Sequence, residues 1–167
     1  MTSNCRPEDP SEHSQWRPLR LLQTAMDGDI ARVYAESGIV GVKPSWVMEL
    51  LRLNSRGAMT ITELAESVQL THSAISQKVA GMRVAGLVKT SQGSDARSKK
   101  IVLTPKARRI VGKLAAEWRA TEATIAEIES EVSCPLSQIV SDIESVLQIK
   151  SFHDRIVEKL AQDPEWR

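Results

Sequence analysis

Apolar residues recur every three or four positions along most of this chain, a spacing that predicts amphipathic helices rather than strands. A first helix is expected over residues 19–36, and it ends at Ser37-Gly38 because glycine is a common helix stop. A second helix is expected from Pro44, since proline is favoured in the first turn of a helix. Apolar stripes over residues 105–160, interrupted at Cys134-Pro135, predict two long C-terminal helices.

Two short helices and a hairpin are expected between these outer helices. Thr60 and Glu63 have the spacing of a capping box, in which the threonine caps the helix and the glutamate reaches back. A further helix follows after a short gap, over residues 72–85. Residues 87–90 and 100–104 are β-like, and the polar segment between them predicts a hairpin with a long tip. The positions expected to be buried on the second of these short helices are Ile75, Val79 and Met82.

Charge divides the chain more sharply than its net value suggests. The 167 residues carry 22 lysines and arginines and 21 acids, for a formal net charge of +1. Residues 71–109 hold nine of the basic residues and a single acid, a net of +8, which leaves −7 for the remainder. A DNA duplex attracts such a basic block through counterion release, whatever the base sequence. The charge pattern therefore indicates a nucleic-acid partner for this region.

Two helices joined by a tight turn and followed by a hairpin are typical of a winged helix-turn-helix. In that motif the second helix enters the major groove with its N-terminal half against base edges. Gln77 can bond bidentately to adenine, and Ser73 can bond to bases or to phosphates. Ala80 and Gly81 would let the backbone approach the groove closely, although Gly81 is equally well explained as a tolerated helix glycine. The residues expected to contact DNA from this helix are Thr71, His72, Ser73, Ala74, Ser76, Gln77, Lys78 and Arg83, with the two cations at its sides, beside phosphates.

The hairpin tip carries a second signal for DNA. An arginine at a hairpin tip can enter the narrow, strongly negative minor groove, and Arg97 occupies such a position. Asp95, two residues earlier, can hold Arg97 in an extended pose. A solvated charged loop is the alternative, and the preceding helix-turn-helix favours the DNA contact over it. The wing residues expected at DNA are Asp95, Arg97, Ser98, Lys99 and Lys100.

These segments resemble the MarR family of transcriptional regulators. The matching runs are residues 61–66, 70–77, 85–88, 95–99 and 102–104. The resemblance covers roughly residues 19–160, and it implies a homodimer held by the first helix and the last two helices. It also implies a recognition helix over residues 71–85 and Arg97 in the minor groove, supported by Asp95. In many members, a small and often aromatic ligand releases the DNA by binding between the dimerisation helices and the DNA-binding lobe.

Three positions depart from the family pattern. Gln69 stands where the tight turn usually has glycine, so a left-handed backbone is expected there at some strain. Ala96 replaces a common wing arginine, which puts one phosphate contact in doubt, and Ala107 replaces a common glycine. None of these departures removes the motif.

The expected fold is mostly α with a small β-wing: a winged helix-turn-helix with long N- and C-terminal dimerisation helices. The expected organisation is a disordered tail over residues 1–18, a first dimerisation helix and linker over 19–43, a DNA-binding lobe over 44–104, and C-terminal dimerisation helices over 105–167.

The expected function is that of a cytoplasmic, homodimeric transcriptional regulator that binds double-stranded DNA sequence-specifically at a pseudo-palindromic operator. A repressor released by a small-molecule ligand is the favoured form. The alternative is a winged-helix protein that binds a protein partner or coats DNA without sequence preference. No nucleophile–base grouping or phosphate-binding glycine loop is present, so an enzyme is not expected.

The remaining chemistry-bearing residues have weaker signals. Tyr34, Trp46 and Trp118 either line a ligand pocket or fill the core, where aromatic residues are mostly used. Cys5 and Cys134 lie far apart, which favours a reducing cytoplasm, with a redox-sensing thiol as the alternative. The histidines and cysteines lack ligand spacing, so neither a metal nor a cofactor is expected. No apolar run is long enough for a membrane helix, so no membrane partner is expected either.

Overall fold

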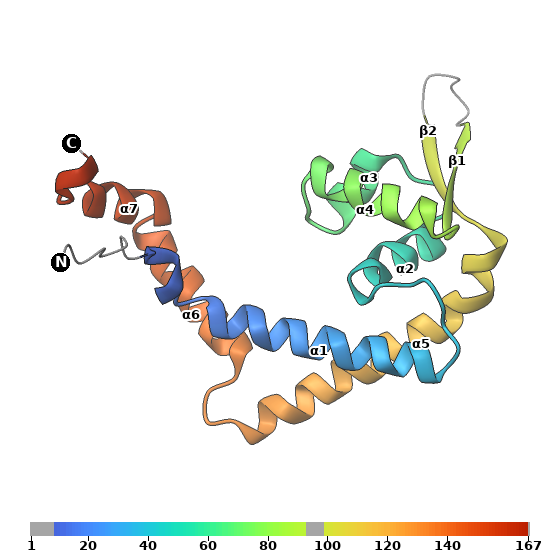
Figure 1. The fold of residues 1–167 in the computed structure, drawn as a ribbon, viewed down its shortest axis with the longest axis horizontal. Coiled ribbons are helices and arrows are strands. Elements are labelled where there is room, and N and C mark those ends of the chain that lie inside the picture. Colours follow the sequence, from blue (N-terminus) through green and yellow to red (C-terminus); the bar gives the residue numbers. More distant parts are fainter. Residues whose placement is uncertain (1–8, 93–98, 167) are drawn as a thin grey trace, which may run out of the picture. The chain divides into compact units, whose positions relative to one another are not determined.

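The computed structural model describes residues 9–92 and 99–166 of the chain, which forms two compact units, Met1–Ala116 and Glu117–Arg167 (Figure 1). The helices are α1 (Arg17–Glu36), α2 (Val47–Arg56), α3 (Ile61–Ser67), α4 (His72–Val84), α5 (Pro105–Glu131), α6 (Leu136–Ile149) and α7 (Phe152–Leu160). The strands are β1 (Val88–Gln92) and β2 (Lys99–Leu103), and three short 3-10 turns are η1 (Pro10–His13), η2 (Pro44–Trp46) and η3 (Pro164–Trp166). The predicted fold class, mostly α with a small β-wing, is confirmed.

The first long helix begins and ends close to its predicted positions. α1 starts at Arg17, and η1 precedes it within the segment that was expected to be a tail. It ends at Glu36, where the Ser37 amide donates to the Val33 carbonyl and Gly38 takes a φ of 67°. A glycine adopts this backbone without a Cβ penalty, so it terminates the helix as the sequence predicts.

The predicted capping box is present at the start of α3. The Glu63 amide donates to Thr60 Oγ1 over 3.1 Å, and the Thr60 amide donates to Glu63 Oε2 over 2.7 Å. Two backbone amides that the helix leaves unpaired are thereby satisfied. The hydrogen bond from the Thr60 amide also holds the pKa of the Glu63 carboxyl below its ordinary value. The first helix of the helix-turn-helix therefore begins where its sequence places it.

A turn with an uncommon backbone joins α3 to α4. Gln69 has a φ of 54°, and it is the one non-glycine residue with a positive φ in residues 9–92 and 99–166. The Leu70 amide then donates to the Ala65 carbonyl over 3.0 Å, which closes the end of α3. The left-handed backbone predicted for Gln69 is confirmed.

The strain in the backbone at Gln69 can be tested by substitution. We expect Gln69→Gly to raise the free energy of unfolding by about 0.5–1 kcal/mol, because glycine avoids the left-handed Cβ penalty and loses part of that gain as chain entropy. Gln69→Val should lower it, since a β-branched residue tolerates a positive φ poorly. Urea denaturation at one protein concentration measures both changes. A Gln69→Gly midpoint at or below that of the unsubstituted chain would contradict the strain at this turn.

The base of the wing is hydrogen-bonded to the segment that leads into α3. β1 and β2 pair antiparallel, with Val88 opposite Leu103, and each strand begins and ends within two residues of its prediction. On its other edge β2 pairs with Met59: the Ile101 amide donates to the Met59 carbonyl over 2.6 Å, and the Met59 amide donates to the Ile101 carbonyl over 3.2 Å. The segment that leads into α3 therefore acts as a third strand at this one position.

The core of the first unit is aliphatic and draws on both the helices and the wing. The apolar residues of α4 predicted to be inward, Ile75, Val79 and Met82, are all buried. They share the core with fully buried side chains from the other elements, including Leu50, Leu64, Leu87, Ile101 and Leu114. Burial of one side of α4 fixes which side it presents to solvent.

The prediction of a single last helix is wrong. α6 ends at Ile149, and Lys150 is extended, with φ −148° and ψ 119°. Ser151 then caps α7 by accepting a hydrogen bond from the Asp154 amide over 3.1 Å. The overlooked signal is the serine followed three residues later by an acid, a pattern typical of a helix start. Three helices therefore follow the wing where two were expected.

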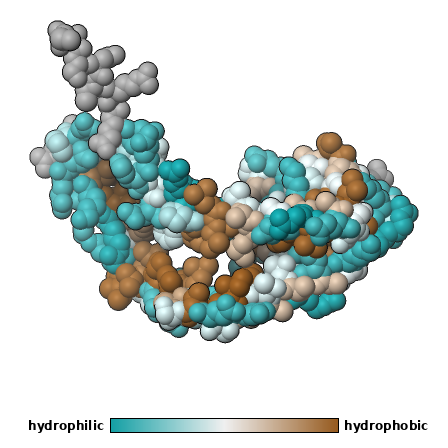
Figure 2. Space-filling view, turned by 60° about the horizontal axis from the view of Figure 1, so that its bottom comes forward, coloured by the Kyte–Doolittle hydropathy of each residue, from teal (hydrophilic) through white to brown (hydrophobic). Residues whose placement is uncertain are grey.

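Neither α6 nor α7 has a buried residue. Their apolar side chains remain exposed, Ile149 at 87% and Phe152 at 61%. Figure 2 shows apolar residues, in brown, reaching the surface of the molecule. Helices that expose apolar faces of this kind need a further surface to cover them.

Candidate nucleic-acid interface

α4 presents a polar side to solvent, opposite the side that fills the core. Its start is fixed by Thr71, whose Oγ1 accepts a hydrogen bond from the Ala74 amide over 3.2 Å. Of the residues predicted at DNA, Thr71, His72, Ser73, Gln77 and Arg83 are exposed, and Ala74, Ser76 and Lys78 are half-buried. Hydroxyl, imidazole and amide groups are therefore available along the first turns of the helix, and such groups can bond to base edges.

Gly81 lies on a different side of α4 from the one predicted. A Cβ at Gly81 would lie only 2.7 Å from Cζ2 of Trp46, so the indole packs directly against the helix backbone. Trp46 is 9% exposed, and the ammonium of Lys43 lies 5.2 Å from the centre of its ring. The interpretation that Gly81 lets DNA approach is wrong, because the absent side chain makes room for Trp46. Ala80, its neighbour, is exposed as expected.

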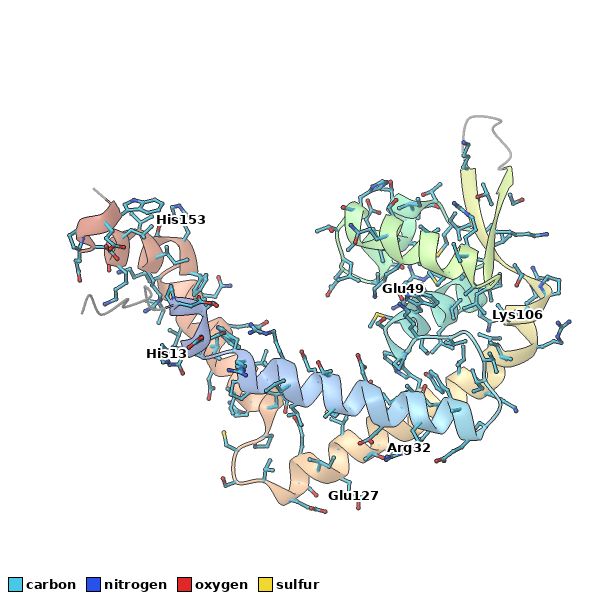
Figure 3. The ribbon with its side chains drawn as sticks, viewed as in Figure 1. His13, Arg32, Glu49, Lys106, Glu127 and His153 are labelled. Carbon is cyan, nitrogen blue, oxygen red and sulfur yellow. The ribbon has the colours of Figure 1, made fainter. Side chains whose placement is uncertain are left out.

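A buried ion pair that the sequence did not suggest ties α4 to α2. The side chain of Glu49, which is labelled in Figure 3, is fully buried. Its Oε1 accepts a hydrogen bond from Lys78 Nζ over 2.7 Å. Glu49 Oε2 is buried without a hydrogen-bond partner in the described residues. The Lys78 ammonium, predicted at a phosphate, is thus directed to α2. An acid beside the apolar positions Val47, Leu50 and Leu53 was the available signal.

Other cations of the basic block are held at the junction of α4 and the wing. Arg83 Nη2 donates to Thr90 Oγ1 over 3.0 Å, which joins the last turn of α4 to β1. Lys106 Nζ donates to the carbonyl at the C-cap of α4 over 2.8 Å. Lys89 on β1 is exposed. Hydrogen bonds to neutral groups leave these charges in place, so the surface around α4 stays strongly basic.

The wing supplies the second part of the predicted interface. Lys99 and Lys100 begin β2, the first exposed and the second half-buried. Asp95, Arg97 and Ser98 lie outside the residues that the structure describes, so their DNA contacts stay predictions.

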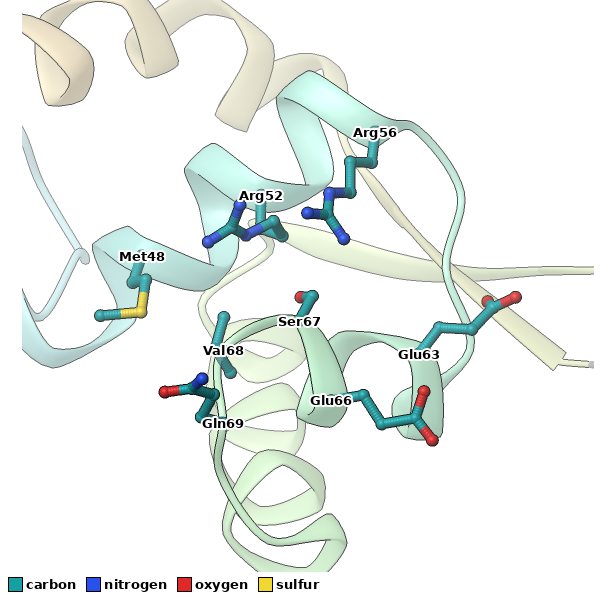
Figure 4. A pocket seen from close by; sticks show the side chains of 8 residues that line it. All are labelled: Met48, Arg52, Arg56, Glu63, Glu66, Ser67, Val68 and Gln69. Atoms are coloured by element: carbon teal, nitrogen blue, oxygen red, sulfur yellow. The ribbon is translucent and has the colours of Figure 1, made fainter.

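The aromatic residues considered for a ligand pocket have separate surroundings. Tyr34, at 2% exposure, and Trp46 are buried in the first unit, and Trp118 is half-buried in the second. A cavity of about 590 Å³ opens elsewhere, between α2 and α3 (Figure 4). It is lined mostly by polar and charged side chains: Met48, Arg52, Arg56, Glu63, Glu66, Ser67, Val68 and Gln69. Trp46 is explained by its contact with Gly81, which favours its role in the core.

Metal-binding groups, membrane-spanning helices and free thiols were sought in residues 9–92 and 99–166. No three histidine, cysteine or carboxylate side chains gather there in a way that could hold a metal ion. No helix in this part of the chain is both long enough and apolar enough to cross a membrane. Cys134, between α5 and α6, is an exposed free thiol.

A tight helix-turn-helix followed by a paired wing makes this chain a winged helix-turn-helix protein. A model of the MarR family matches residues 40–98, which span α2, α3, α4 and β1. This part of the chain, which contains the helix-turn-helix, is therefore similar to the MarR family, in agreement with the resemblance found in the sequence.

Solved structures of several regulators have a similar fold. The regulator MosR of M. tuberculosis in complex with DNA is 24% identical, with a TM-score of 0.55 over 81% of this chain and 95% of that one. MepR of S. aureus, in a DNA complex, is 17% identical, with a TM-score of 0.58 over 81% of this chain and 96% of that one. The regulator SlyA is 13% identical, with a TM-score of 0.54 over 84% and 99%. At these identities the likeness is one of fold. No curated protein matches the sequence.

Proposed function

We propose that this protein is a homodimeric transcriptional regulator that binds double-stranded DNA in a sequence-specific manner. The observation that carries the proposal is the exposed polar side of α4, which lies within the block of residues 71–109 that carries a net charge of +8. Structures of MosR and MepR that contain DNA support the same role for this fold. Selection of bound duplexes from a random pool tests the proposal directly, and failure to enrich any sequence would overturn it.

In the proposed complex, two α4 helices enter successive major grooves about 34–36 Å apart on a pseudo-palindromic site. Ser73 and Gln77 face base edges, and His72 contacts a base or a phosphate. Arg97 enters the flanking minor groove, whose negative potential attracts a guanidinium group. Exposed cations such as Lys99 bind phosphates, which supplies affinity without sequence information.

The dimer is proposed from the second unit. α6 and α7 have no buried residue, although apolar side chains recur along both. A two-fold pairing of identical chains is the commonest way in which such surfaces are covered. Analytical ultracentrifugation tests this part of the proposal, and a monomer at micromolar concentration would contradict it.

The base-reading role of α4 can be tested at Gln77. We expect Gln77→Ala to lose about 1–3 kcal/mol of discrimination at one base pair of each half-site, because the amide is the group that bonds to the base. Affinity for unselected DNA should change less, since glutamine carries no charge. Selection of bound sequences measures the preference, with Gln138→Ala on α6 as a matched control. A preference that is unchanged in Gln77→Ala would remove this residue as a reader.

The wing role can be tested at Arg97. We expect Arg97→Ala to weaken DNA binding about tenfold or more, which corresponds to about 1.4 kcal/mol, without loss of folded structure. A gel-shift titration measures the affinity, and circular dichroism checks the fold. Arg119→Ala, on α5, is the matched control. Full affinity in Arg97→Ala would contradict the minor-groove assignment.

Repression and release by a small-molecule ligand complete the proposal. Both rest on the family resemblance, and a screen for metabolites that release the selected duplex tests the second. A steep salt dependence without any ratio between specific and non-specific affinity would instead support the alternative of a protein that coats DNA.

A further inference from the structure

Two contacts between α4 and the start of α2 lie side by side. Trp46 and Glu49 are three residues apart, and they contact Gly81 and Lys78, which are also three residues apart. Residues at this spacing lie on one face of a helix. The indole and the carboxylate therefore hold the middle of α4 at two neighbouring points.

The position of Glu49 determines what Lys78 can do. The carboxylate is fully buried and lies 2.7 Å from the ammonium, whereas the Lys78 side chain is 27% exposed. If Lys78 moved to a DNA phosphate, it would leave a carboxylate in the protein interior without a counter-ion, which is strongly unfavourable. Glu49 Oε2 already lacks a partner in the described residues, so no second donor there is available to replace Lys78. The pair should therefore persist when DNA is bound.

We propose that Lys78 is not a DNA ligand, and that Glu49 is a positioning residue that withdraws the Lys78 charge from the interface and fixes α4 to α2. This inference rests on the proposed DNA binding. Lys78 thereby differs from Arg83 and Lys106, which bond to neutral groups and keep their charge for phosphates. Glu49 thereby limits the affinity of the protein for DNA of any sequence.

The salt dependence of DNA binding separates this role from a phosphate contact. The logarithm of the binding constant falls with the logarithm of salt concentration by about 0.9 for each phosphate contact in B-DNA. The experiment measures this slope by fluorescence anisotropy with a labelled mixed-sequence duplex. The full chain is compared with Glu49→Gln, with the double variant Glu49→Gln, Lys78→Met, and with Lys99→Met as a control for a proposed phosphate contact.

We expect the double variant to keep the slope of the unsubstituted chain, because it removes no phosphate contact and leaves no lone buried charge. Glu49→Gln alone should steepen the slope by about 0.9 per protomer, since the released ammonium can reach a phosphate. A purely structural role for the pair would leave this slope unchanged. Lys99→Met should make it shallower by the same amount.

A shallower slope in the double variant would overturn the inference, because Lys78 would then be a phosphate ligand. An unchanged slope in Glu49→Gln would overturn it as well. In both cases the unsubstituted chain still binds DNA, so the proposed function stands. If the unsubstituted chain does not bind the duplex, the proposed function fails and this inference fails with it.

Discussion

Lys78→Met is expected to lower the free energy of unfolding by about 3–5 kcal/mol, the range for a buried ion pair that loses one partner. The substitution leaves the Glu49 carboxylate fully buried without its counter-ion, and burial of an unpaired charge is among the most destabilising changes in a protein. A loss of this size is a large part of the stability of an ordinary domain. Urea denaturation at fixed protein concentration measures it.

The matched control is Lys89→Met, which removes an exposed lysine from β1 and should change the stability by no more than about 0.5 kcal/mol. Adding Glu49→Gln to Lys78→Met should recover most of the loss, since a buried ion pair replaced by neutral groups is often near neutral in stability. If Lys78→Met behaves like Lys89→Met, the ion pair contributes nothing to folding.

Trp46→Ala is the second large effect, with an expected loss of about 3–5 kcal/mol. The indole is 9% exposed and covers the backbone of α4 at Gly81, so its removal leaves a cavity beside α4. Trp16→Ala is the control, because Trp16 is 55% exposed and should contribute little. Thermal or urea denaturation of the two variants measures the difference, and equal small losses would contradict the packing of Trp46.

Gly81→Ala tests the same contact from the other side. Alanine is favoured over glycine within a helix by up to about 1 kcal/mol, and Gly112→Ala on α5 should show this gain because nothing lies within 4 Å of the new Cβ. At Gly81 the Cβ meets the Trp46 ring at 2.7 Å, and overpacking of this kind costs about 1–3 kcal/mol. Gly81→Ala should therefore destabilise. A gain equal to that of Gly112→Ala would show that the ring moves freely.

Local signals predicted most of the helix-turn-helix. The capping box at Thr60 and the inward face that contains Ile75 depend on residues a few positions apart, so the sequence carries them directly. The same holds for Pro105, which begins α5, and for the glycine stop after α1. In each case one backbone or side-chain preference decides the outcome. The left-handed backbone of Gln69 was instead expected from the family pattern, which has glycine at this position.

The errors of the sequence prediction come from contacts between distant residues. Glu49 lies 29 positions from Lys78, and a glutamate in a helix is ordinarily exposed, so its position beside Val47 and Leu50 was only a weak local signal and did not identify its partner. Gly81 was placed on the DNA side from its spacing relative to the buried Ile75, Val79 and Met82, and only the contact with the distant Trp46 ring shows the side on which it lies. The break between α6 and α7 is different, because Ser151 followed by Asp154 is a local signal for the start of a helix.

The bridge between Met59 and Ile101 divides the wing into two regions of different stability. At Ile101 the strand β2 has hydrogen-bonded neighbours on both edges, whereas in the described part of the chain Lys99 and Lys100 pair with β1 alone. Local opening of β2 can therefore begin at Lys99 and stop at Ile101, without loosening the segment that leads into α3. One strand thus combines an outer end that can adapt to the shape of a partner with an inner end that keeps its register.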